Sequence, residues 1–81
     1  MGQLSSGDPA NYRRQAIDSI NSTERSVNSI NRRLTDNEQV TVTHIREFLK
    51  QAKAALASGD VDGARNLAAK AKVLLGELTA P

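Results

Sequence analysis

Apolar residues recur at three- and four-residue steps along most of the chain, which is the spacing of a helix with one buried face. A first stripe comprises Ala16, Ile20, Val27, Ile30 and Leu34. A second comprises Val42, Ile45, Leu49, Ala52 and Leu56. A third comprises Val61, Ala64, Leu67, Ala68, Ala71, Leu74, Leu75 and Leu78. The pattern predicts three amphipathic helices at about 9–34, 37–57 and 61–79.

Capping residues separate the three stripes. Asp8-Pro9 opens the first helix with a cap and a proline at the first helical position. Between the first and second helices, Thr35 with Glu38, or Asp36 with Gln39, has the spacing of a capping box. Gly59-Asp60 combines a glycine able to close a helix in the left-handed conformation with an aspartate able to cap the next one. The second and third helices should therefore form an antiparallel hairpin.

These signals predict an all-α fold, a three-helix antiparallel up-down bundle over residues 8–81. Alanines in the second and third stripes permit close approach, so we expect those two helices to pack most tightly. The first helix is rich in Ser and Asn, which are weak helix formers, so its helicity should depend on docking. Val40-Thr41-Val42-Thr43 alternates like a strand, but no second strand signal exists to pair with it.

Composition narrows the classes of function. The chain has 81 residues, no cysteine, a net charge of +2 and 2% aromatic residues. A dedicated polyanion binder, a base-stacking platform and a thiolate metal site are therefore disfavoured, and no apolar run is long enough for a membrane span. Residues 1–7 are polar and aperiodic, which predicts a flexible tail or a cloning remnant.

The run from Leu56 through Gly59-Asp60 to Ala64, Ala68 and Ala71 resembles the helix–turn–helix of tetratricopeptide-like units, although no 34-residue repeat is present. Residues 54–78 also resemble C-terminal helical segments of small, uncharacterised bacterial envelope proteins and lipoproteins. The second resemblance implies a bacterial cell-envelope or periplasmic location. It is compatible with a fragment of a larger protein and with a lipid anchor on a longer precursor, and it supplies no site residues.

Candidate chemical motifs have simpler structural interpretations. Asp60-Val61-Asp62-Gly63 shares part of a calcium-loop pattern, but the position of the bidentate Glu is occupied by Ala69, so helix capping is the better interpretation. His44 is the sole histidine, which is too few for a transition-metal site or a catalytic triad. We therefore predict no catalytic, cofactor-binding or metal-binding residues, and no enzyme.

Two modification motifs are also present. Met1-Gly2 with Ser6 matches an N-myristoylation pattern, which we interpret as a cloning remnant because no basic cluster adjoins it. Asn21-Ser22-Thr23 is a formal glycosylation sequon, but its place within a helix favours coincidence.

Basic residues follow one side of the second helix and recur along the first. The candidate partner-binding residues are Arg14, Arg25, Arg32, Arg46, Lys50 and Lys53. We predict a non-enzymatic interaction or structural module that recognises a partner helix or self-associates, with the first helix as the contact element. The alternative is a weak nucleic-acid-binding bundle that uses these Arg and Lys stripes.

Overall fold

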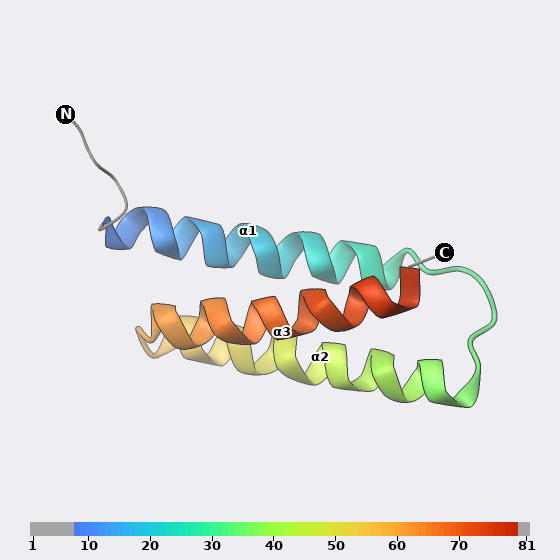
Figure 1. Cartoon of the computed structure of the whole chain (residues 1–81). Coiled ribbons are helices and arrows are strands. Elements are labelled where there is room, and N and C mark those ends of the chain that lie inside the picture. Colours follow the sequence, from blue (N-terminus) through green and yellow to red (C-terminus); the bar gives the residue numbers. More distant parts are fainter. Residues whose placement is uncertain (1–7, 80–81) are drawn as a thin grey trace.

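A computed structural model describes residues 8–79, which form three α-helices and no strand. Helix α1 spans Pro9–Asn28, α2 spans Asp36–Ala57 and α3 spans Val61–Thr79. The helices run up, down and up, and α3 lies between the other two in Figure 1. The expected all-α three-helix bundle is confirmed.

The predicted caps form at all three helix starts. Asp8 Oδ1 accepts a hydrogen bond from the amide of Ala10 at 3.0 Å. Of the two capping-box alternatives, the Thr35–Glu38 pair is present, with the Glu38 amide donating to Thr35 Oγ1 and the Thr35 amide donating to Glu38 Oε1. At the hairpin, Gly59 has a φ of +86° and Asp60 Oδ1 accepts from the amide of Gly63 at 2.9 Å.

Helix α1 ends at Asn28, so the prediction that the first helix continues to residue 34 was wrong. Asn28, Ser29 and Asn31 are weak helix formers, and the Ser29 hydroxyl donates to the carbonyl of Ser26 at 2.9 Å. Ile30 still packs against the core, but it does so from the connecting segment. The position of Ile30 in the apolar stripe therefore predicted its burial correctly but did not predict the length of the helix.

Helices α2 and α3 make the most extensive contact in the bundle, as the alanine seams predicted. Ala52, Ala64, Ala68 and Ala71 are all buried, which lets the two backbones approach closely. Ile45 is the largest of the described side chains that are fully buried. Val40–Thr43 lies within α2, which confirms that its alternating pattern is not a strand.

Helix α1 packs chiefly on α3 and makes few contacts with α2. Its buried face consists of Ala16, Ile20, Thr23 and Val27. Of the three helix pairs, α1 and α2 are therefore the least closely packed.

Candidate functional site

A groove of about 230 Å³ lies between α1 and α2, where those helices are least closely packed. The residues that line it are Glu24, Arg46, Leu49, Lys50 and Lys53. Leu49 belongs to the core and is 3% exposed, so it forms the floor of the groove and offers little apolar surface. The groove is therefore mainly basic, with the aliphatic parts of the Lys and Arg side chains along its wall.

Three of the predicted partner-binding residues meet in this groove. Arg46, Lys50 and Lys53 are separated by four and then three residues, so the helical repeat places them on one face of α2. That face borders α1, a relationship that the sequence of α2 alone could not establish. The predicted basic stripe is thus one wall of a groove that α1 completes.

Polar contacts across the groove fix two of the three cations. Arg46 Nη1 donates to Asn28 Oδ1 at 2.9 Å, and Lys53 Nζ lies 2.7 Å from Glu24 Oε2. Lys50 is exposed and forms no ion pair within residues 8–79. With three cations and one carboxylate, the groove has a net positive charge and one ammonium group available to a ligand.

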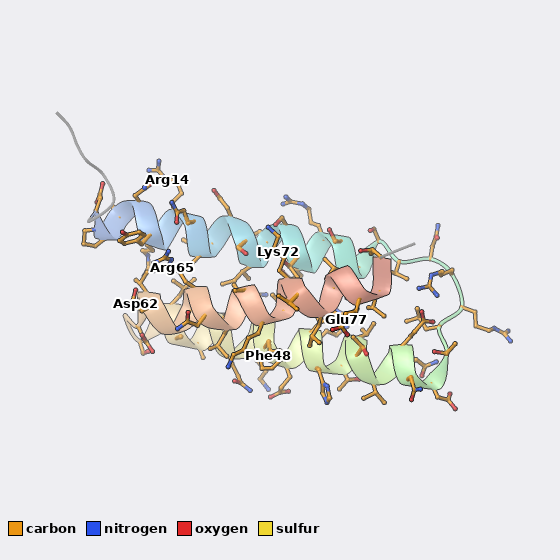
Figure 2. The ribbon with its side chains drawn as sticks, viewed as in Figure 1. Arg14, Phe48, Asp62, Arg65, Lys72 and Glu77 are labelled. Carbon is orange, nitrogen blue, oxygen red and sulfur yellow. The ribbon has the colours of Figure 1, made fainter. Side chains whose placement is uncertain are left out.

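Arg14 and Arg25, from the same predicted set, lie apart from this groove. Arg14 projects away from the bundle in Figure 2. Arg25 lines a different, largely polar depression between α1 and α3, together with Asp18 and Lys72. These two arginines therefore belong to separate surfaces.

Arg32 is 49% exposed at its side chain, but its guanidinium group is held by contacts within the bundle. Its Nη1 and Nη2 atoms donate to the two carboxylate oxygens of Glu38 at 3.0 and 2.9 Å, and Nη2 also donates to the Leu78 carbonyl at 3.2 Å. The hydrogen bond from Arg32, together with the amide of Thr35, lowers the pKa of Glu38 from 4.5 to about 2. Arg32 thereby links the α1–α2 connection to the last turn of α3.

The groups weighed for metal chemistry have other surroundings. Asp60 is engaged in the helix cap, and the exposed Asp62 carboxylate lies 3.8 Å from Arg65. His44 is exposed on α2. Within residues 8–79, no three or more His, Asp or Glu side chains are grouped so that they could hold a metal ion.

The modification motifs fall in two different settings. Asn21 is exposed, but Thr23 of the same sequon is 2% exposed, and both lie inside α1. The predicted tail at residues 1–7, including the Met1-Gly2 motif, lies outside the described residues. In the part of the chain that the structure describes, no helix is both long and apolar enough to cross a membrane.

Sequence reasoning did not identify Glu24 and Leu49 as parts of this groove, or Asn28 as the hydrogen-bond partner of Arg46. Leu49 belongs to the second apolar stripe, which predicts a core residue, and no motif marks Glu24. The signal that was available is the complementarity between Glu24 on the first helix and Lys53 on the second. Without the relative rotation of α1 and α2, however, many other pairs of opposite charge fit equally well.

Comparison of the chain with protein-family models, with curated proteins and with solved structures finds no match.

Proposed function

We propose that this chain is a non-enzymatic interaction module whose α1–α2 groove binds an acidic, amphipathic segment of a protein partner. The observation that carries the proposal is the convergence of Arg46, Lys50 and Lys53 around Leu49. Carboxylates on a bound segment would meet the cations, and its apolar side chains would lie along the aliphatic parts of the Lys and Arg side chains.

The length of the cationic wall along α2 suits a short helical segment of a partner. The distance along α2 from Arg46 to Lys53 is roughly 10 Å, or about two turns of helix. Acidic residues three or four positions apart on a partner helix would repeat at the same interval as the three cations. Asn28 and Glu24 hold Arg46 and Lys53 in place beforehand, which reduces the side-chain entropy lost on binding.

The groove lies beside the first helix and not on its apolar seam, where the sequence suggested recognition. The seam residues Ala16, Ile20 and Val27 are buried in the bundle, so they are not available to a partner. What α1 offers the groove is its polar flank, Glu24 and Asn28.

Nucleic acid is the weaker alternative. The groove offers only three cations to a phosphate backbone, and Lys53 among them is already paired with Glu24. The two aromatic rings are also elsewhere: Tyr12 lies beneath Arg65, 4.3 Å from its guanidinium carbon, and Phe48 borders α3. A base-stacking surface next to the groove would favour single-stranded nucleic acid, and the lining residues do not include an aromatic ring.

An NMR titration of the ¹⁵N-labelled chain tests the proposal. The probe is a synthetic amphipathic peptide of Leu and Glu, with an analogue carrying Gln at each Glu position as its neutral counterpart. We expect the acidic peptide to shift the amide signals of Glu24, Leu49 and Lys50, and the neutral peptide to bind more weakly. Lys50→Glu should weaken acidic-peptide binding about tenfold, because it replaces an attractive contact with a repulsive one.

The matched control is Lys72→Glu, which makes the same charge change on α3 outside the groove. Equal weakening by both variants would indicate a general charge effect and would contradict the proposal. Tighter binding of a DNA duplex than of the acidic peptide, with affinity falling steeply with salt, would favour the nucleic-acid alternative. The resemblance to tetratricopeptide-like units and to envelope proteins stays a prediction that this experiment does not address.

A further inference from the structure

The outward face of α3 carries an apolar residue between two opposite charges. Lys70, Val73 and Glu77 occur at positions i, i+3 and i+7, so they lie in one row along the helix. Val73 is 65% exposed, more than Ile17 or Val40, which are the other exposed large hydrophobic residues described. Covering so exposed a valine side chain with a partner lowers the free energy of the complex.

A shallow apolar groove adjoins this row on the α2 side. The groove has a volume of about 360 Å³ and is lined by Phe48, Ala69, Lys70, Val73 and Leu74. Figure 2 shows Phe48 and Glu77 on the same side of the molecule, along the boundary between α2 and α3. Lys70 Nζ lies 6.0 Å from the centre of the Phe48 ring, so its charge stands at the edge of the groove.

The row is complementary to itself when a second α3 runs antiparallel to it. A two-fold axis passing between Val73 and Leu74 relates Lys70 to Glu77, because each lies three and a half positions from that point. The axis also brings Val73 of each copy over the groove beside Leu74 of the other. Both ends of the row then form a Lys–Glu pair, and both apolar grooves are covered.

The backbone of α3 permits a close approach on this face. Ala69 and Gly76 flank Val73 and add little bulk. At Gly76 no atom lies within 4 Å of the position that a Cβ would take, so the surface there is open. Small residues beside a projecting valine are suited to helix–helix packing.

We propose that a second copy of this chain docks on the Lys70–Val73–Glu77 face of α3, with the two α3 helices antiparallel. Symmetry places the two α2 helices on the same side of the pair, so that α2 and α3 of both copies form a four-helix layer. A contact between single helices of this length buries less than the roughly 1,200 Å² of a standard stable interface. The dimer is therefore weak and depends on protein concentration.

Analytical ultracentrifugation of the whole chain over a range of concentrations tests this inference. We expect the wild type to shift from monomer towards dimer as concentration rises. Lys70→Glu alone and Glu77→Lys alone should each raise the dimer dissociation constant about tenfold, because each places like charges at both ends of the interface. An equimolar mixture of the two variants should dimerise more strongly than either variant alone, since opposite charges then face each other.

The double variant Lys70→Glu with Glu77→Lys should recover wild-type dimerisation. The two residues are about 10 Å apart along one helix, so this recovery cannot come from a contact within one chain. A wild type that stays monomeric at millimolar concentration, or a dimer indifferent to all of these variants, would overturn the inference. Circular dichroism of each variant checks that the bundle remains folded.

Lys50→Glu separates this inference from the proposed peptide-binding groove. The substitution lies on the α1–α2 side and should leave the dimer dissociation constant unchanged. If it instead abolished dimerisation, the basic groove and not the α3 face would be the contact between copies.

Discussion

Gly59 and Gly76 have different backbone requirements although no atom crowds either position. Gly59 has a φ of +86° at the α2–α3 turn, whereas Gly76 lies within α3. A Cβ added at either position would meet nothing within 4 Å. The effect of a side chain is therefore decided by backbone conformation and not by contact.

The same substitution should consequently have opposite effects at the two glycines. Gly59→Ala should lower the free energy of unfolding by about 1–2 kcal/mol, because the left-handed conformation is strained for an L-residue with a Cβ. Gly76→Ala should raise the free energy of unfolding by about 0.5–1 kcal/mol, because alanine loses less backbone entropy in a helix. Urea denaturation at low protein concentration measures both changes, and equal effects at the two sites would contradict this explanation.

The sequence predicted those contacts that join residues close together along the chain. The caps of Asp8, Thr35 and Asp60 join atoms two or three residues apart, so their spacing alone identified them. The role of Arg32 was not predictable in this way. Its contact with the Leu78 carbonyl spans 46 residues and exists only after α3 has docked.

Among the elements, α1 shows where apolar periodicity misleads. Ile30 and Leu34 continue the spacing of the first stripe and are both half-buried, yet the helix ends at Asn28. A stripe records which residues face the core, and a connecting segment that folds back over the core can satisfy it as well as a helix does. In α2 the caps and the length of the stripe outweighed the strand-like alternation at Val40–Thr43.

The beginning of α2 should make stability sensitive to acid. Glu38 has a pKa of about 2 in the folded chain against an ordinary value of 4.5. As the pH falls, the Glu38 carboxylate therefore takes up a proton at a higher pH in the unfolded chain than in the folded chain. The contribution of Glu38 to stability is complete above about pH 4.5 and is lost as the pH falls towards 2.

Glu38→Gln isolates this contribution, because Gln can still accept the capping hydrogen bond but does not titrate. Thermal unfolding followed between pH 7 and 2 should show a steeper loss of stability below about pH 4.5 in the wild type than in the variant. Parallel profiles for the two proteins would show that the Arg32–Glu38 pair does not contribute to acid sensitivity.

Across the whole molecule, we expect stability to be concentrated in the α2–α3 hairpin. That pair makes the most extensive contact, and Ile45, the largest fully buried side chain described, belongs to α2. Helix α1 contributes a narrow seam that includes the buried hydroxyl residue Thr23, and many of its other residues are weak helix formers. Its attachment is completed by polar contacts such as those of Lys53 with Glu24 and Arg46 with Asn28.

Amide hydrogen exchange followed by NMR should reveal this difference. We expect amides in the middle of α1 to exchange faster than those in the middle of α2 and α3, because α1 can open without breaking the alanine-lined contact. Uniform protection in all three helices would instead show that the bundle opens only as a single cooperative unit.

The candidate groove likewise depends on how the helices dock in the whole molecule. The spacing of Arg46, Lys50 and Lys53 predicted a shared face of α2, but the sequence could not specify what that face borders. Rotation of α1 by one residue would present different side chains to Lys53. Only the docked bundle joins the basic stripe to Glu24.

An odd number of helices has a consequence for anything joined to this bundle. Helix α1 begins at Pro9 at one end of the molecule, and α3 finishes at Thr79 at the other, as Figure 1 shows. Two proteins fused before α1 and after α3 would thus leave from opposite ends of the bundle. A two-helix hairpin would bring such fusions together, whereas this bundle would act as a short rigid spacer between them.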